Sequence, residues 1–285
     1  MDIVDAQVHV GPGKIDEALS AMDALGIRSI LIDEYWFGRK PGDPNYPVGK
    51  VLRPIQPTAE LAAMLYPDRF SYLVRIDRND PDITSVIRMV HDAPYARALR
   101  ITPGMVSAEA KAFANGEYDA CFTAANDAGL PLFVFAPAQS QDLMQYAKKF
   151  PSLRIIVDHC GLLSNSMRQA VGGGIAPMSA EAQLAAFDEV LALADLPNVA
   201  LKWAHAPAMF GVRGYPGEGL WPILRKALNS FGAERIMWAS DASANQSGES
   251  WAELLFGVIG NPDLTQIERE FLLGGTVRAW LDWPV

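Results

Sequence analysis

The sequence has few of the residues that build disulfide frameworks and metal clusters. Among its 285 residues are two cysteines, Cys121 and Cys160, and four histidines. The cysteines form no Cys-x-x-Cys pair, and so low a number in a chain of this length indicates a reducing compartment without structural disulfides. We therefore expect both cysteines to be inert, buried thiols.

Other features are also missing, and each absence excludes a class of function. Acidic residues outnumber basic ones, 33 against 24, which gives a net charge of -9 and no basic run that could neutralise a phosphate backbone. The longest apolar runs are far shorter than the roughly 20 residues that cross a membrane, and the first strand-like run leaves no room for a leader. We expect a cytoplasmic protein with neither nucleic acid nor membrane as a partner.

The sequence does contain a regular alternation of short apolar runs with longer amphipathic stretches, the pattern of repeated βα units. The candidate strands are Ile3–His9, Arg28–Glu34, Phe70–Asp77, Ala96–Ile101, Leu132–Ala136, Arg154–His159, Val199–Ala204 and Arg235–Asp241. No Gly-x-Gly-x-x-Gly turn follows the first of them, which argues against an open dinucleotide-binding sheet. The sequence predicts an α/β fold, a single (β/α)8 TIM barrel over residues 1–285, since such barrels run to about 250 residues as one domain.

Three segments between these elements are too long and too rich in glycine and proline to be simple βα turns: Phe37–Pro57, Thr102–Gly116 and Leu162–Ser179. Each follows the carboxyl end of a candidate strand, where barrel enzymes place their substrate loops. Any one of them could be a disordered surface excursion. Together on one rim they predict a lid or a pocket wall.

Polar side chains interrupt the apolar faces of several strands. Alternation in the first strand places Asp5, Gln7 and His9 on the face opposite to valine and alanine, and a buried aspartate needs a partner or a function. The same strand alternation predicts that three further charged residues face the lumen, namely Arg75, Arg100 and Lys202. Taken singly, such charges could pair with each other or cap a helix. Their convergence on one rim, with His159 and Asp241 at further strand ends, predicts an active site.

The four histidines differ in their positions. His9 and His159 each end a strand, and we interpret both as functional. His205 begins a loop three residues after Lys202, where a pocket role and an ordinary loop role are equally compatible with the sequence. His91 lies in a helical pattern and is expected to be a solvated or capping residue.

At these residues the sequence resembles the amidohydrolase-2 group of the amidohydrolase superfamily, over nearly the whole chain. The resemblance depends on Asp5-Ala6-Gln7-Val8-His9, Val157-Asp158-His159-Cys160-Gly161, Asn198-Val199-Ala200-Leu201-Lys202, Trp238-Ala239-Ser240-Asp241 and the closing stretch from Gly274 to Leu281. It implies sugar lactonase, pyrone-dicarboxylate lactonase or decarboxylase chemistry. In the family, a His-x-His pair on the first strand, later histidines and a final Asp hold a divalent metal.

This chain matches the implied metal set only in part. Gln7 stands where the family has its first histidine, and the fifth strand, Leu132–Ala136, offers no ligand. His9, His159 and Asp241 would supply the three ligands of a catalytic zinc, but an amide oxygen is a weak zinc ligand. The cofactor is therefore either one divalent metal, zinc first, or none. The resemblance implies that some lactonases of this group work without one.

The sequence thus predicts a hydrolase that opens a lactone or similar ester of a small carboxylated or sugar-acid substrate. Asp241 would activate water, while His159 and His9 would donate to the carbonyl oxygen or orient the base. The expected substrate-binding residues are Gln7, Arg75, Arg100, Lys202 and His205. The alternatives are a metal-dependent non-oxidative decarboxylase of a small carboxylic acid, and a degenerate barrel that only binds a small ligand. A homo-oligomer is compatible with the sequence.

Overall fold

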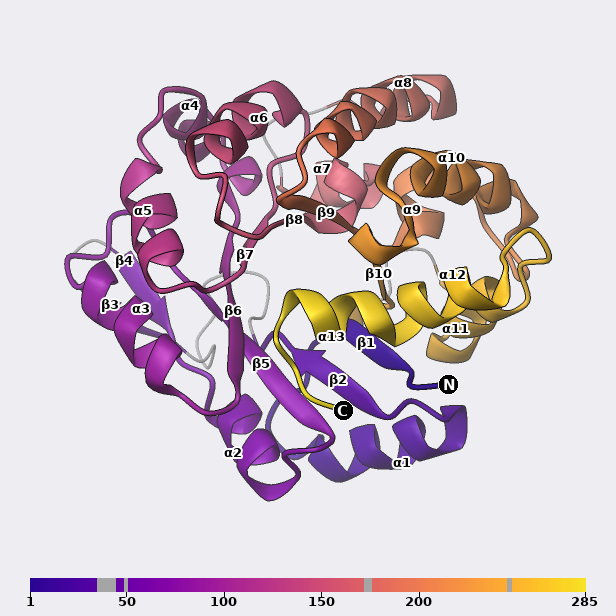
Figure 1. Cartoon of the computed structure of the whole chain (residues 1–285), viewed down its shortest axis with the longest axis horizontal. Helices are drawn as coiled ribbons and strands as arrows, with labels where there is room; N and C mark the ends of the chain where they lie inside the picture. Colours follow the sequence, from indigo (N-terminus) through magenta and orange to yellow (C-terminus); the bar gives the residue numbers. More distant parts are fainter. Residues whose placement is uncertain (35–44, 49–50, 172–175, 245–247) are drawn as a thin grey trace.

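The computed structural model describes residues 1–34, 45–48, 51–171, 176–244 and 248–285. In this part of the chain eight parallel strands form one sheet in the order β1 (Val4–Val8), β2 (Ser29–Ile32), β5 (Phe70–Arg75), β6 (Ala96–Ile101), β7 (Leu132–Val134), β8 (Ile155–Val157), β9 (Val199–Ala204) and β10 (Ile236–Ala239). The last strand returns beside the first, so the sheet curls into a nearly closed barrel surrounded by helices (Figure 1). The predicted (β/α)8 TIM barrel is confirmed, and each predicted strand contains an observed one.

The helices of the described residues are α1 (Ile15–Leu25), α2 (Pro57–Leu65), α3 (Ile83–Asp92), α4 (Ser107–Ala114), α5 (Asp119–Asp127), α6 (Ser140–Lys149), α7 (Asn165–Val171), α8 (Ala180–Leu191), α9 (Ala206–Phe210), α10 (Trp221–Phe231), α11 (Trp251–Ile259), α12 (Gln266–Glu270) and α13 (Thr276–Trp280). Local chemistry sets their ends. Helix α1 stops at Gly26, whose φ of 71° only glycine adopts easily. Helix α11 starts with a capping box between Ser250 and Glu253.

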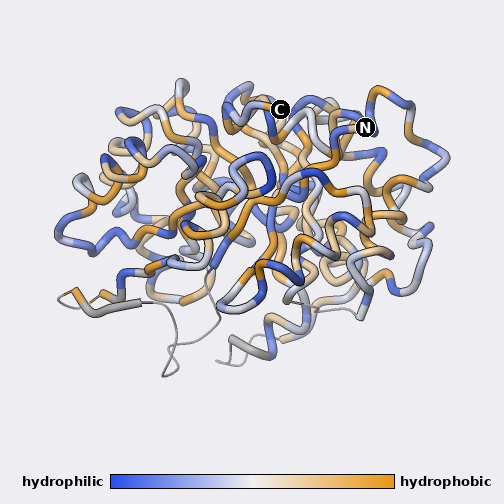
Figure 2. Tube along the Cα trace, turned by 90° about the horizontal axis from the view of Figure 1, so that it is seen from below, coloured by the Kyte–Doolittle hydropathy of each residue, from blue (hydrophilic) through white to orange (hydrophobic). Residues whose placement is uncertain are grey.

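Apolar side chains fill the lumen from alternate strand positions, and the opposite set packs against the helices. Val4, Leu31, Phe133 and Ile156 belong to one buried cluster, to which the tail adds Val277, Leu281 and Trp283. The segment from Val277 to Trp283 therefore closes the amino end of the barrel by intrachain packing. Both chain ends lie on this same side of the molecule (Figure 2).

The seam between β1 and β10 corrects one expectation from strand alternation. Val4 and Ala6, expected on the outer face, lie in the lumenal cluster. Asp5 turns instead toward the helix layer, where its carboxylate accepts hydrogen bonds from Ser240 N at 2.9 Å and Trp251 Nε1 at 2.8 Å. The pairing of β1 with β2 shifts register between Asp5 and Val8. This bulge-like irregularity turns Gln7 and His9 to the inward face, while Val8 packs in the outer cluster.

The three long segments contain regular structure. Phe37–Pro57 contributes a two-stranded antiparallel hairpin, β3 (Asn45–Val48) and β4 (Val51–Pro54), and residues 37–44 and 49–50 lie outside the described ones. Thr102–Gly116 holds α4, and Leu162–Ser179 holds α7, with the triple glycine 172–174 outside the described residues. No helix of the described residues has the length and apolar character needed to cross a membrane.

Candidate active site

Three histidines and one aspartate meet at the carboxyl ends of the strands. His9 Nε2 lies 3.1 Å from Asp241 Oδ1, His159 Nε2 lies 3.1 Å from Asp241 Oδ2, and His205 Nε2 lies 3.2 Å from the same oxygen. All four residues are buried. They come from the ends of β1, β8, β9 and β10, so the barrel brings together groups that are far apart in the sequence.

A left-handed backbone conformation determines the direction of three of these side chains. His159 and His205 have a φ of 50° and Asp241 a φ of 49°, a region that non-glycine residues seldom adopt and that clusters at functional sites. Strand alternation alone would turn His159 and His205 toward the helices, because Ile156 and Ala204 face the lumen. The left-handed turn after the strand brings both imidazoles onto Asp241.

Fixed acceptors orient two of the histidines. His9 Nδ1 lies 2.5 Å from the backbone carbonyl oxygen of Asp33, and His159 Nδ1 lies 2.6 Å from Asp158 Oδ1. A carbonyl oxygen only accepts hydrogen bonds, so Nδ1 of His9 carries a proton and Nε2 is directed at Asp241. Each ring is thereby held by one nitrogen and presents the other to the centre of the site.

The charges at this centre shift the pKa values of Asp241 and His9 in opposite directions. Burial disfavours the ionised carboxyl of Asp241, but the adjacent histidines, His9 first, hold its pKa well below the ordinary 3.8. Burial likewise disfavours protonated His9, yet the Asp241 carboxylate outweighs it and raises the pKa of His9 above 6.5. The site therefore favours an ionised carboxylate beside an imidazolium.

A layer of buried ion pairs lies beneath the histidines. Arg75 donates to Asp33 at 2.9 and 2.6 Å, and Arg100 bridges Asp33 and Asp158. Lys202 Nζ lies 2.5 Å from Asp158 Oδ1 and also donates to the Gln7 side-chain oxygen. Burial by itself would raise the pKa of the Asp33 and Asp158 carboxyls. The adjacent cations outweigh this effect and hold both pKa values low, with Arg75 as the largest lowering influence on Asp33 and Arg100 on Asp158. This layer fixes Asp158, which in turn holds His159.

The structure brings together His9, His159, His205 and Asp241, and it places Gln7 Nε2 3.5 Å from His9 Nε2. Arg75, Arg100 and Lys202, expected to face an acidic substrate, are instead paired with Asp33 and Asp158. Asp33 and Asp158 were not among the predicted site residues. The alternation Leu31-x-Asp33 on the second strand was a usable signal for Asp33, because Leu31 fills the lumen. His91 is exposed on α3, as expected.

Two buried atoms at the centre keep unused hydrogen-bonding capacity. His205 Nε2 and Asp241 Oδ1 have no hydrogen-bond partner among the described residues, although both lie within ion-pair distance of a neighbour. Buried polar atoms are rarely left in this condition. They identify a position for a small polar ligand between a potential donor and an acceptor.

The donor set does not fit the metal that the resemblance implies. Within the described ranges, no group of three or more His, Cys, Asp or Glu side chains is arranged to hold a metal ion. Gln7, which the sequence predicts at the first ligand position, has a side-chain oxygen that already accepts a hydrogen bond from the Lys202 ammonium. A divalent ion would have to bind beside that ammonium, which would repel it.

The chain is similar to known proteins in both sequence family and fold. The family model Amidohydro_2, described as amidohydrolase, matches residues 51–283. No curated protein sequence matches the chain. An amidohydrolase structure from Burkholderia multivorans with bound zinc is 17% identical, covers 100% of both chains and superposes with a TM-score of 0.75.

Two further solved structures are similar in fold. A probable 2-pyrone-4,6-dicarboxylic acid hydrolase from Acinetobacter baumannii, with citric acid bound, is 12% identical over 99% of this chain and 100% of its own, with a TM-score of 0.70. The 5-carboxyvanillate decarboxylase from Sphingomonas paucimobilis is 15% identical over 99% of both chains, with a TM-score of 0.63. Because the family model spans most of the sequence, the chain belongs to the amidohydrolase family Amidohydro_2.

Proposed function

We propose that the chain is a hydrolase that opens a lactone or similar ester with water activated by Asp241. The observation that carries the proposal is the single buried carboxylate on which three imidazoles converge, with Asp241 Oδ1 and His205 Nε2 left without hydrogen-bond partners. A water that donates to Asp241 Oδ1 and a carbonyl oxygen that accepts from His205 would use both atoms. Ester hydrolysis needs this pair of a base and an oxyanion donor.

The proposed reaction conserves atoms and protons. The water oxygen attacks the carbonyl carbon while Asp241 takes one water proton, and the carbonyl electron pair moves to oxygen. Imidazole N–H groups of His205 and His9 stabilise that oxyanion, with the Gln7 amide as an additional donor. The tetrahedral intermediate then collapses, the ring C–O bond breaks, and the leaving alkoxide takes the proton from Asp241. The product is a hydroxy acid.

The low pKa of Asp241 makes the resting carboxylate a weak general base, because efficient bases titrate near the working pH. The histidines that hold this pKa down are also the groups that would turn to the substrate. When a carbonyl oxygen draws His9 or His205 away from Asp241, the carboxylate loses part of the electrostatic attraction that stabilises its charge, and it becomes more basic. Substrate binding would therefore activate the base at the moment it is needed.

The buried ion pairs support the proposal through a role other than the substrate binding that the sequence predicted for Arg100 and Lys202. Arg100 and Lys202 hold Asp158, which orients His159, so we assign them a positioning role. The decarboxylase alternative loses support, because the chemistry that the resemblance implies for it needs a bound metal, and the donor set fits none. A barrel that only binds its ligand is the remaining alternative.

A panel of sugar and dicarboxylate lactones and aromatic carboxylic acids tests the proposal, with acid release and carbon dioxide release both recorded. We expect acid release from a lactone, and a fall in kcat of about 10²- to 10⁴-fold in Asp241→Asn. Asp16→Asn, an exposed site on α1, is the matched control. Carbon dioxide release, or turnover that survives Asp241→Asn, would reject the proposed chemistry.

A further inference from the structure

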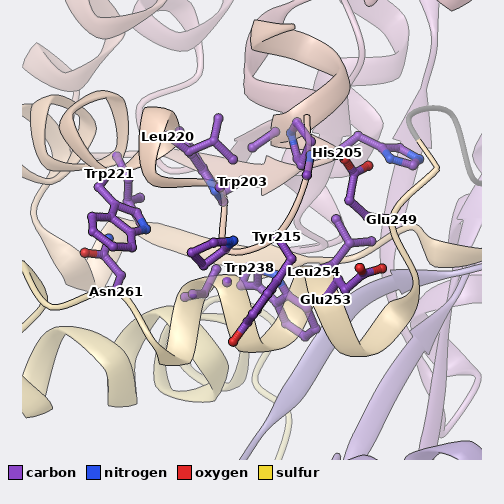
Figure 3. A pocket seen from close by; sticks show the side chains of 18 of the residues that line it. Trp203, His205, Tyr215, Leu220, Trp221, Trp238, Glu249, Glu253, Leu254 and Asn261 are labelled. Carbon is purple, nitrogen blue, oxygen red and sulfur yellow. Dashed lines mark hydrogen bonds between the residues drawn. The ribbon is translucent and has the colours of Figure 1, made fainter. Parts of the chain in front are cut away.

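A small cavity adjoins the candidate active site outside β9 and β10. It lies between α10 and α11 and has a volume of ≈ 50 Å³. Trp203, Trp238 and Leu254 give it apolar walls, and the exposed Tyr215 belongs to the loop that covers it (Figure 3). His205 also lines it, so one imidazole touches both the cavity and Asp241.

Two polar atoms facing this apolar space have no partner. Trp221 Nε1 and Glu249 Oε2 are buried atoms without a hydrogen-bond partner among the described residues. Figure 3 shows Trp221 and Asn261 at one end of the cavity and His205 and Glu249 at the other. Such atoms in a native fold call for a ligand or ordered water. A donor at the far end and an acceptor at the near end match a hydroxyl better than a charged group.

The size of the cavity limits what enters it. A site of ≈ 50 Å³ has room for roughly three to five waters, since one water needs about 10–15 Å³ of such volume. An engineered cavity that takes benzene measures about 150 Å³. The space therefore fits a short aliphatic chain and is too small for an aromatic ring.

The charge of the surroundings limits the ligand further. The cations of the candidate active site, Arg75, Arg100 and Lys202, are already paired with Asp33 and Asp158. The cavity itself adds the carboxylates Glu249 and Glu253 and no lysine or arginine of the described residues. A substrate carboxylate in this cavity would be repelled and would find no counter-charge.

We propose that this cavity is the subsite for a short, uncharged aliphatic substituent of the substrate, attached close to the carbonyl that reacts at Asp241. A terminal hydroxyl on that substituent meets Trp221 Nε1. The assignment rests on the proposed hydrolase. It narrows the proposed substrate class, a lactone or similar ester, to neutral lactones or esters bearing a side chain of a few carbons.

The test is a homologous series of neutral lactones with alkyl substituents from methyl to hexyl, together with a hydroxyalkyl and a carboxyalkyl member. We expect kcat/KM to rise about fourfold for each methylene that is buried, to peak at a short chain and then to fall. The carboxyalkyl member should be the poorest substrate. Preference for it, or no dependence on chain length, would overturn the proposal.

Variants of Leu254 connect this preference to the cavity. Leu254→Trp fills the space and should remove the gain from the substituent, whereas Leu254→Ala enlarges it and should move the optimum to longer chains. The control Leu184→Trp, on the exposed side of α8, should keep the original profile. A profile that is unchanged in both Leu254 variants would also overturn the assignment.

Binding measurements separate this proposal from the function on which it rests. If no lactone is turned over, calorimetric affinities for the same series are compared between the wild type and the Leu254 variants. A chain-length optimum that shifts with Leu254 would retain the subsite and reject the hydrolase. Affinities that change neither with the length of the substituent nor with the substitution at Leu254 would reject the subsite.

Discussion

His159 and Asp158 are neighbours in the chain, and their side chains bond to each other: Nδ1 of the histidine lies 2.6 Å from Oδ1 of the aspartate. Consecutive residues of a strand point to opposite faces. The pair forms because His159 leaves the strand with φ 50° and ψ 48°, which turns its ring back over Asp158 and toward Asp241. The Asp158 carboxylate, which is itself held by ion pairs with Arg100 and Lys202, thus orients the imidazole of His159.

Lys202 is expected to act on the reaction through Asp158. Lys202→Met keeps the side-chain length but breaks a buried ion pair, which typically costs about 3–5 kcal/mol of folding free energy. We expect a lower kcat together with a lower melting temperature, and the same change in KM for neutral and carboxylated lactones. Lys149→Met, which breaks an exposed pair on α6, should cost no more than about 1 kcal/mol. An increase in KM confined to carboxylated substrates would show instead that Lys202 binds substrate.

The raised pKa of His9 makes one part of the stability depend on pH. The folded state binds the His9 proton more tightly than the unfolded state does, so this contribution is complete below pH 6.5 and is lost as the pH rises through the raised value. The free energy of unfolding, measured with urea across this range, should fall more steeply for the wild type than for His9→Asn. The exposed control His91→Asn should follow the wild type. Parallel curves for wild type and His9→Asn would contradict the assignment.

Metal content tests the interpretation of Gln7 and Lys202. Because the Lys202 ammonium is bonded to Gln7 and the donor set lacks metal-holding geometry, we expect elemental analysis to find no stoichiometric zinc. Turnover should be unchanged by a chelator and by added zinc. One zinc per chain with chelator-sensitive turnover would show that His9, His159 and Asp241 suffice to bind it.

Asp5 is expected to stabilise the fold at the seam of the barrel. Its carboxylate accepts from Gln7 N, Ser240 N and Trp251 Nε1, and its burial raises its pKa to about 6. Asp5→Ala leaves these buried N–H groups unpaired, at about 1–3 kcal/mol each, so we expect a loss of about 3 kcal/mol or more. Asp5→Asn should lose less, since its oxygen still accepts. Urea denaturation is the measurement, and the exposed Asp16→Ala should stay within about 0.5 kcal/mol of the wild type. If Asp5→Ala lowered the free energy of unfolding by an equally small amount, Asp5 would have no stabilising role at the seam.

The sequence by itself determined the order of strands and helices and the identity of most groups at the rim. Hydrophobic periodicity is local, so it located every strand of the barrel without knowledge of its neighbours. The same alternation correctly turned Arg100 and Lys202 into the lumen, where Ala98 and Ala200 confirm the face. Family motifs added the expectation that His9, His159 and Asp241 would lie close together.

Only the tertiary structure decided which groups pair with each other. Alternation cannot foresee a register shift such as the one after Asp5, because that irregularity belongs to the fit between two strands. It also cannot foresee the left-handed turns that bring His159 and His205 to Asp241. The pairing of lumenal cations with Asp33 and Asp158 depends on the closure of the barrel, since residues from different strands meet there only when the sheet curls. Charge in a sequence therefore indicated a polar centre, and the three-dimensional fold decided which of its charges remain available to a substrate.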